Sequence, residues 1–207
     1  MRKLLLLGTL VGISSLAHAT TITAPASLDT LEGVDAYSWG ISIPVPQGQT
    51  VASAEIDFTS VTLQAANSSG TGYLYTDLLN SQKTGVTTAF DNDAPGDYWA
   101  TQFSGANITT LGSQFFKSVG TTLTWSYVLN ASQLSALNSY LTAGTFNIGI
   151  DPDCHYSVGS ICLDYTLSPT NHNNSVPDAA TTALLLALGL GALELVRRQI
   201  LARSAKA

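Results

Sequence analysis

Three aspartates lie close together in the stretch FDNDAPGDYWA, residues 90–100 of the chain. Asp91, Asp93 and Asp97 place three carboxylates within seven residues, and Gly96 permits a tight turn between them. Hard oxygen ligands on one loop suit Ca²⁺, although this loop lacks the glycine and glutamate spacing of an EF-hand. The simpler interpretation is a solvated turn made of turn-forming residues. Calcium is therefore a candidate cofactor of this loop, and the turn is the alternative.

A second acidic pair, Asp151 and Asp153, stands in DPDC and carries the same two interpretations. Tyr98 and Trp99 follow the first acidic loop directly. An aromatic ring beside a calcium loop is a candidate platform for stacking on a sugar. One member of such a pair is more often a core residue. Tyr98 and Trp99 are therefore candidate sugar contacts.

The common catalytic motifs are absent from the sequence. It contains no Gly-x-Ser-x-Gly, no His-Glu-x-x-His and no glycine-rich phosphate loop. Its histidines beyond the N-terminal region are His155 and His172, and its central glutamates are Glu32 and Glu55. A glycosidase needs only two carboxylates at the right distance, which sequence spacing cannot show. We expect no catalytic residues and no enzyme activity.

Charged residues make up 11% of the chain and are unevenly placed. Residues 20–175 carry twelve acidic side chains against the two lysines Lys83 and Lys117, a net charge of −10. Such a surface repels nucleic acid, because phosphate binding depends on clustered Lys and Arg. It is compatible with divalent cations, or with solubility outside the cell. We therefore expect no nucleic acid among the partners.

The N-terminus has the three parts of a secretory signal peptide. Arg2 and Lys3 form a charged start, residues 4–16 form a short apolar segment, and residues 17–19 form a small-x-small cleavage site. The sequence therefore predicts a signal peptide over residues 1–19 and a mature chain that begins at Thr20.

Two cysteines, Cys154 and Cys162, lie in the part predicted to be exported. An even count in an oxidising compartment favours a disulfide. A turn near Val158 and Gly159 would place the two cysteines opposite each other across a hairpin. Two separate thiols are the alternative.

Apolar residues alternate with polar ones along several short runs of the central region, and Gly, Asn, Asp and Ser clusters separate these runs. This pattern predicts an all-β ectodomain over residues 20–167, an antiparallel β-sandwich or jelly roll. The clearest runs are residues 54–63, 122–129, 145–151 and 161–167.

One segment, residues 130–144, has the helical spacing instead. Asn130 or Ser132 can cap its start, and Gly144 can end it. We expect one short helix packed over a sheet edge. Its periodic leucines are Leu134, Leu137 and Leu141.

Beyond the ectodomain, residues 168–175 form a polar spacer, and an apolar segment follows. Residues 179–196 would make a helix of roughly 27 Å, close to the roughly 30 Å of a hydrocarbon core. Arg197 and Arg198 follow at once and would hold that end in the cytoplasm. We expect a transmembrane helix in the precursor; a buried helix of the globular domain is the alternative.

Residues 176–207 therefore combine a short motif, Val176-Pro177-Asp178, with an apolar helix and a basic cluster. This order, behind a signal peptide, resembles the VPD-type variants of the PEP-CTERM class of sorting signals. The sequence departs from many variants at Ala179 and Ala180, where Gly or Ser is usual.

The resemblance implies that an exosortase, an integral-membrane protease-transpeptidase, processes the chain at the inner membrane. Val176, Pro177 and Asp178 would then be substrate residues. The protein would afterwards be released or attached to an envelope rich in exopolysaccharide. A plain single-pass membrane anchor is the alternative.

Together these features predict an exported protein of the cell surface or extracellular matrix, with a structural or adhesive role in a biofilm matrix. The alternative function is a calcium-assisted carbohydrate-binding module.

Overall fold

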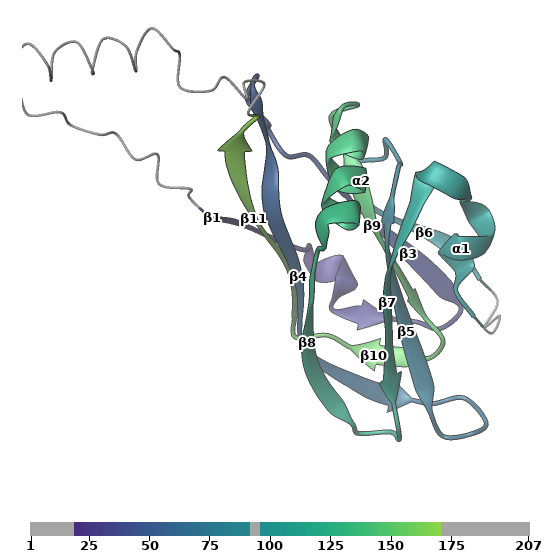
Figure 1. The fold of residues 1–207 in the computed structure, drawn as a ribbon. Helices are drawn as coiled ribbons and strands as arrows, with labels where there is room; N and C mark the ends of the chain where they lie inside the picture. The colour runs from purple at the N-terminus through teal and green to yellow at the C-terminus, as the bar shows by residue number, and fades with distance from the viewer. Residues whose placement is uncertain (1–18, 92–95, 171–207) are drawn as a thin grey trace, which may run out of the picture. The chain divides into compact units, whose positions relative to one another are not determined.

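The structure, a computed structural model, describes residues 19–91 and 96–170 of the chain (Figure 1). The predicted signal peptide up to residue 18, the loop aspartate Asp93 and everything from residue 171 onward lie outside the described residues. The chain divides into two compact units after Pro169, and residues 19–169 belong to the first of them.

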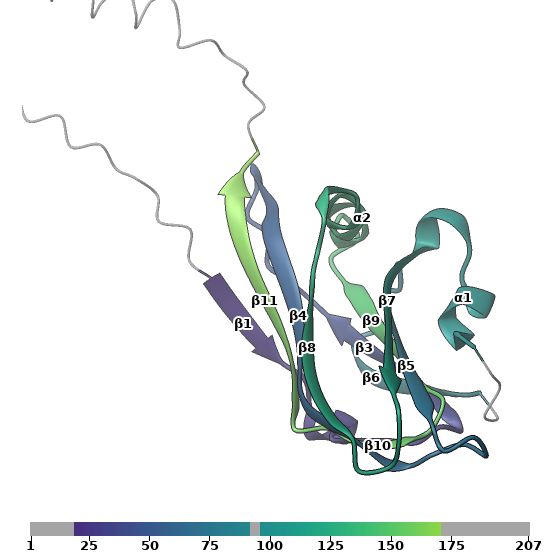
Figure 2. The ribbon, with the colours of Figure 1, turned by 60° about the horizontal axis from the view of Figure 1, so that its bottom comes forward.

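Two antiparallel sheets pack face to face as a β-sandwich (Figures 1 and 2). The first sheet has the order β1-β11-β4-β10-β2, with β8 also paired to β4, and the second has the order β6-β3-β9-β5-β7. The predicted all-β antiparallel sandwich is confirmed, and the finer assignment to a jelly roll stays a prediction. The strands of the first sheet are β1 (Ala19–Thr23), β2 (Thr30–Leu31), β4 (Gln49–Ala65), β8 (Thr122–Val128), β10 (His155–Ser157) and β11 (Ser160–Pro169). Those of the second sheet are β3 (Asp35–Ile41), β5 (Gly72–Leu79), β6 (Gly85–Phe90), β7 (Ile108–Phe116) and β9 (Phe146–Pro152).

The long strand β4 shows how the sequence pattern produces the core. Ile56 and Phe58 face inward, and so do Val61 and Leu63, although the two pairs are out of phase by one residue. A bulge between Phe58 and Val61 absorbs the extra residue, and Ser60 adopts a positive φ of 52° there. The strand therefore keeps a single apolar face along its whole length, because the backbone shifts register where the sequence does.

The helix α2 (Ala131–Leu141) crosses one end of the sandwich between the two sheets (Figure 2). Asn130 caps it: the side chain accepts hydrogen bonds from the N–H groups of Ser132 and Gln133, and Gln133 returns one to the Asn130 N–H. The predicted helix and cap are confirmed. The helix packs against β4, β7 and β9 rather than over a single sheet edge, because Leu137 and Tyr140 insert into the shared core.

Strands β10 and β11 are consecutive parts of one segment that runs antiparallel to β4. His155 lies opposite Ala65 and Cys162 lies opposite Asp57, so the chain does not reverse between the two cysteines. Among the described residues there is no disulfide, and the predicted Cys154–Cys162 bond is wrong. Eight steps of extended chain, at about 3.3 Å each, hold the sulfurs far beyond bonding distance.

The first and last strands of the ectodomain lie side by side. Ala19 of β1 pairs with Thr166 of β11, and Thr23 pairs with Cys162. Within the described part of the chain, no helix has the length and apolar character to cross a membrane. The span predicted at residues 179–196 lies outside that part.

Candidate functional site

The segment between β6 and β7 covers the outer face of the second sheet. It contains a five-residue helix, α1 (Tyr98–Gln102), and a 3-10 turn, η2 (Gly105–Asn107) (Figure 1). Asp97 caps α1, with its carboxylate accepting a hydrogen bond from the Ala100 N–H at 3.2 Å. This aspartate, predicted as a loop ligand, therefore also fixes the start of a helix.

Trp99 fastens α1 to the sheet. Its side chain is 7% exposed and packs with Ala36 and Leu79 in a small second core. Gly149 of β9 leaves the space for this ring, since a Cβ atom there would lie 2.8 Å from Trp99 Cδ1. Trp99 therefore offers no exposed ring face for a sugar, whereas Tyr98 is half-buried beside it.

Five aspartates from separate parts of the chain interact electrostatically on this side of the second sheet. Asp77 lies on β5 opposite Gly149, and Asp151 lies on the neighbouring strand β9 opposite Tyr75. The electrostatic coupling among their carboxylates joins Asp97, Asp91 and Asp153 to them. The two acidic loops that looked separate in the sequence are therefore one site. We call Asp77, Asp91, Asp97, Asp151 and Asp153 the aspartate cluster.

Asp77 is one of the two fully buried members of the cluster. Its side chain is 0% exposed, and within the described chain neither carboxylate oxygen makes a hydrogen bond of good geometry, although the side chains of Thr110 and Asp97 lie within reach of it. Burial first, and then the charge of Asp97, raise the pKa of Asp77 to about 8, while the nearby Thr110 side chain acts in the opposite direction. In the folded protein, the Asp77 carboxyl group therefore tends strongly to stay protonated or to bind a cation.

Asp151 is the second fully buried member, with an exposed fraction of 0%. Its Oδ2 accepts a hydrogen bond from the Tyr98 N–H at 2.7 Å, while its Oδ1 has no partner among the described residues. Burial raises the pKa of Asp151 to about 7; the Tyr98 N–H opposes that rise, and the charges of Asp91, Asp153 and Asp97 add to it. The bond to Tyr98 ties the cluster directly to α1.

The predicted calcium ligands are thus partly brought together. Asp91 and Asp97 belong to the cluster, and Asp93 lies outside the described residues. No three acidic, histidine or cysteine side chains within residues 19–91 and 96–170 form a ready-made metal-binding group. Calcium therefore stays a prediction.

Sequence reasoning missed Asp77. The available signal was a single aspartate inside the otherwise apolar and aromatic run YLYTDLLN. A lone carboxylate in a run that reads as a strand is informative, because such residues are rarely buried without a partner.

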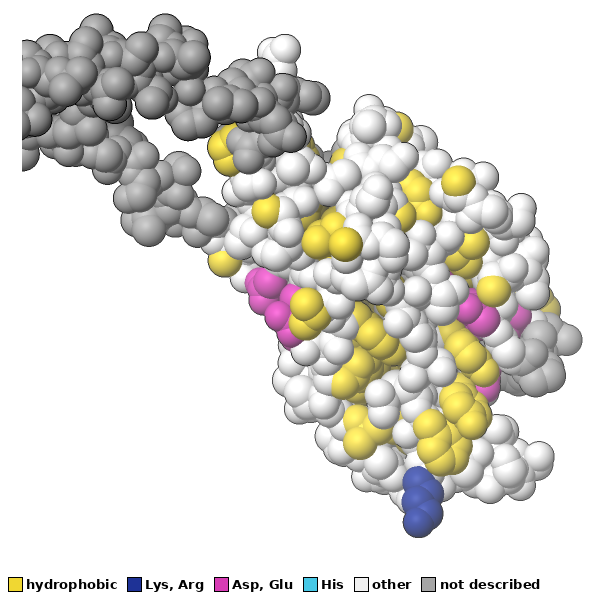
Figure 3. Space-filling view, in the orientation of Figure 1, with side chains coloured by type: hydrophobic (Ala, Val, Ile, Leu, Met, Phe, Trp, Pro, Cys, Tyr) yellow, Lys and Arg dark blue, Asp and Glu magenta, His cyan; other side chains and the backbone are white. Residues whose placement is uncertain are grey.

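A row of aromatic rings lies beside the cluster on the same outer face. Tyr73 is 38% exposed and its cross-strand partner Phe115 is 44% exposed, with ring centroids 4.9 Å apart. Tyr75 continues the row along β5, with its ring 6.0 Å from that of Tyr73. Figure 3 shows hydrophobic side chains gathered over β5 and β7, with acidic side chains next to them. We call Tyr73, Tyr75 and Phe115 the aromatic strip.

The aromatic strip and the aspartate cluster interact electrostatically. Burial raises the pKa of Tyr75 to about 12, and the charges of Asp153 and Asp151 contribute to the rise. The backbone joins them as well, since the Asp153 N–H donates to the Tyr73 carbonyl at 3.0 Å. The aromatic strip therefore lies next to the aspartate cluster, of which Asp77 and Asp151 are buried.

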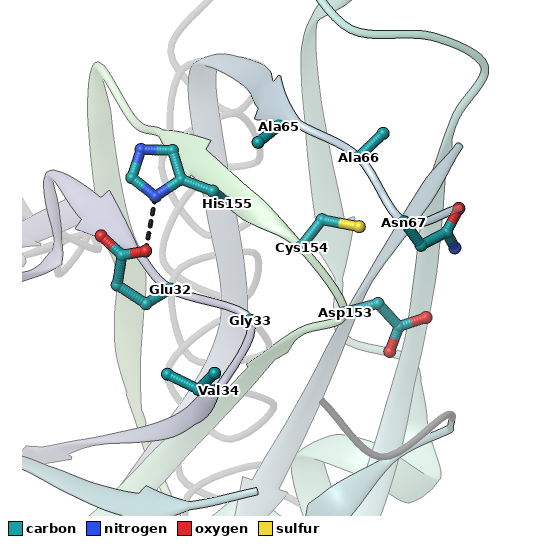
Figure 4. A pocket seen from close by; sticks show the side chains of 9 residues that line it. All are labelled: Glu32, Gly33, Val34, Ala65, Ala66, Asn67, Asp153, Cys154 and His155. Atoms are coloured by element: carbon teal, nitrogen blue, oxygen red, sulfur yellow. Dashed lines mark hydrogen bonds and ion pairs between the residues drawn. The ribbon is translucent and has the colours of Figure 1, made fainter. Parts of the chain in front are cut away.

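A pocket of about 440 Å³ lies at the turn from β9 into β10 (Figure 4). Glu32 and His155 point toward each other across it, with His155 Nδ1 2.6 Å from the Glu32 carboxylate. Cys154 is adjacent to His155 in the chain, but its side chain points toward Asn67. Neighbouring residues of extended chain face opposite ways, so His155 is not placed to act as a base on the Cys154 thiol.

A comparison with family models identifies the tail. Residues 175–200 match the VPDSG-CTERM motif. The tail is a PEP-CTERM-like sorting signal. This confirms the resemblance seen at Val176-Pro177-Asp178, and the matched range includes Arg197 and Arg198.

The sorting signal indicates a protein that is exported and sorted by an exosortase-type system. It therefore implies processing by such a system and a location at the cell surface or outside the cell. No curated protein matches the chain.

Proposed function

We propose that this chain is an exosortase substrate whose β-sandwich serves a structural or adhesive role, without catalysis, at the cell surface or in an exopolysaccharide-rich matrix. The observation that carries the proposal is the sorting signal at residues 175–200. The net charge of −10 over residues 20–175 supports it, because a strongly acidic surface favours solubility outside the cell and repels nucleic acid.

The chemistry of the motif suits a substrate. Pro177 has no N–H to donate and biases Val176 toward an extended conformation. Extended chain pairs readily with the strand-like groove of a protease. On this proposal the tail is an address that is removed once it has been recognised.

The test is the mass of the mature protein in three strains: wild type, one that carries Pro177→Ala with Asp178→Ala, and one that lacks the exosortase. We expect the wild-type mass to lack the tail and the other two masses to retain it. A tail that persists in all three strains contradicts the proposal and leaves a plain membrane anchor.

The aromatic strip favours a second candidate function, carbohydrate binding. Stacked rings that are exposed on a sheet face suit the apolar face of a sugar, and carboxylates beside them can accept hydrogen bonds from its hydroxyls. Because Tyr73 and Phe115 are both more than a third exposed, they are the side chains a glycan would meet.

Affinity electrophoresis in gels that contain the host's own exopolysaccharide tests this function. Each ring is expected to contribute about 0.5–1.5 kcal/mol, so Tyr73→Ala or Phe115→Ala should weaken binding roughly 2- to 10-fold. Val128→Ala is the control, since Val128 is an exposed apolar residue of the first sheet. Equal retardation of all the variants would rule out the strip as the binding surface.

A further inference from the structure

The two fully buried aspartates lack the partner that buried carboxylates need. Asp77 and Asp151 lie under α1, and neither pairs with a lysine or arginine in the described part of the chain. Residues 20–175 contain only two such side chains, Lys83 and Lys117. A buried carboxylate without a cation has to take up a proton or bind a metal ion.

The fold holds these carboxylates close together. Asp77 and Asp151 stand on the adjacent strands β5 and β9, and Asp97, the N-cap of α1, interacts with both. Asp97 uses Oδ1 to cap the helix, and its side chain also lies within hydrogen-bonding reach of Asp77. Asp151 likewise uses Oδ2 for the Tyr98 N–H and leaves Oδ1 without a partner. Three separate segments thus bring carboxylates close together, two of them fully buried.

We propose that the aspartate cluster is a divalent-cation site in which Asp77, Asp97 and Asp151 bind one Ca²⁺. The site differs from a single acidic loop, because two of its three carboxylates come from the strands of the sheet. These carboxylates are not a ready-made metal-binding group among the described residues, so the proposal requires that the side chains adjust around the ion.

The donor set determines which ion fits. All the available donors are oxygen atoms, and the nearest histidine, His155, is paired with Glu32. Carboxylate oxygens from unrelated segments suit Ca²⁺, which tolerates irregular coordination, better than Mg²⁺, which demands a strict octahedron. The lack of imidazole and thiolate donors in the cluster disfavours zinc and copper.

Calcium would also stabilise the outer face mechanically. Tyr98 donates to Asp151 and Trp99 packs on Gly149, so α1 already depends on β9 at two points. An ion held between Asp97 and Asp77 adds a third attachment, to β5. The covering segment would then be most firmly fixed when calcium is bound.

The experiment uses the full chain, purified in detergent and stripped with a chelator at pH 7.5. Wild type is expected to bind one Ca²⁺ per chain by calorimetry. Its melting temperature should rise by roughly 5–10 °C at a hundredfold excess of Ca²⁺ over Kd, with Mg²⁺ at least tenfold weaker. Tb³⁺ replaces Ca²⁺ in a second measurement, since Tyr98 and Trp99 are close enough to sensitise its luminescence.

Matched variants decide the outcome. Asp77→Asn keeps the shape of the side chain and should abolish the calcium-dependent rise, and Asp151→Asn should weaken binding at least tenfold. Asp57→Asn is the control, because Asp57 is a partly exposed carboxylate on the other sheet. No calcium binding by wild type, or equal binding by Asp77→Asn, overturns the proposal and leaves a proton as the neutralising partner. If Asp77→Asn does not fold, the Ca²⁺ affinity of Asp151→Asn and its Tb³⁺ luminescence test the proposal instead.

Discussion

Two groups of carboxylates occupy the outer faces of the two sheets, and they differ in their access to water. On the first sheet Glu55, Asp57 and Asp164 form a partly exposed trio across β4 and β11, and Thr21 donates a hydrogen bond to Asp164. On the second sheet Asp77 and Asp151 are fully buried beneath α1. Figure 3 shows exposed acidic side chains at two separate places on the molecule.

The two groups differ in their access to water because α1 covers one of them, not because their residue types differ. Both groups occupy outward positions of alternating strands, where polar side chains are expected. Burial also raises the pKa of Asp57, and the charges of Glu55 and Asp164 add to the rise, but this trio stays partly exposed to water. An ordinary outward-facing aspartate becomes a candidate site when a helix closes over it. The predictions below test this contrast.

Loosening α1 from the second sheet should have the largest effect on the free energy of unfolding. Trp99→Ala is expected to lower the free energy of unfolding by about 3–5 kcal/mol, because it empties the small core that holds α1. Val128→Ala, a truncation at a 70% exposed position of the first sheet, should change it by less than about 0.5 kcal/mol. Urea denaturation measures both. Similar losses in the two variants would mean that α1 contributes little to the second sheet.

The pH dependence of stability should follow the buried group. The folded-state pKa of Asp77 is about 8 against an ordinary 3.8, so the folded protein holds a proton that the unfolded chain releases. In the presence of a chelator, the free energy of unfolding should therefore fall by on the order of 2–4 kcal/mol as the pH rises from about 4 to 8. The neighbouring carboxylates of Asp97 and Asp151 contribute to this fall.

The matched pair of variants assigns this slope. Asp77→Asn cannot titrate at this position, so its melting temperature should fall less between pH 5 and pH 8 than that of wild type; the slope that remains comes from Asp151, whose pKa burial also raises. Asp57→Asn should keep most of the wild-type slope, because it alters only the surface trio. A slope in Asp77→Asn as steep as that of wild type would place the titration elsewhere.

The contact under Trp99 should give a smaller effect. Gly149→Ala places a Cβ atom 2.8 Å from Trp99 Cδ1 and 3.0 Å from Leu79 Cδ1, so the covering ring must shift. We expect a loss of roughly 1–3 kcal/mol in the free energy of unfolding. Combining Gly149→Ala with Trp99→Ala removes the clash, so the double variant should lose less than the sum of the two.

The polar pairs of the first sheet should matter least. Thr62 and Thr122 share a hydrogen bond of 2.7 Å on its exposed outer face. Thr62→Val should change the free energy of unfolding by less than about 0.5 kcal/mol, because water replaces the lost partner and valine suits a strand. A loss above about 1.5 kcal/mol would show that this face is less accessible to water than its exposure indicates.

The sequence was sufficient for features that depend on local patterns. Alternation predicted β4, β8, β9 and β11, and the phase change in residues 54–63 corresponds to the bulge at Ser60. The Asn130 cap and the sorting tail are also local signals, because a few neighbouring residues determine each.

Features that depend on distant pairing could not be predicted. The disulfide was wrong because Cys154 and Cys162 lie along one direction of chain, which only the register against β4 reveals. The aspartate cluster unites β5, β9 and α1, and no spacing in the sequence brings Asp77 next to Asp97. The covering role of α1 likewise depends on Gly149, some fifty residues from Trp99.

The adjacency of β10 and β11 in one continuous segment has a mechanical consequence for a surface protein. Tension applied at Pro169 enters β11, which is joined to β4 along residues 160–169, and continues through β10 to Asp153 and its bond with Tyr73. A ladder pulled along its length must break many hydrogen bonds at once, whereas one opened from its end breaks them singly. A glycan held at Tyr73 and a tether at Pro169 would therefore load the sandwich in shear, the direction in which a sheet resists force best.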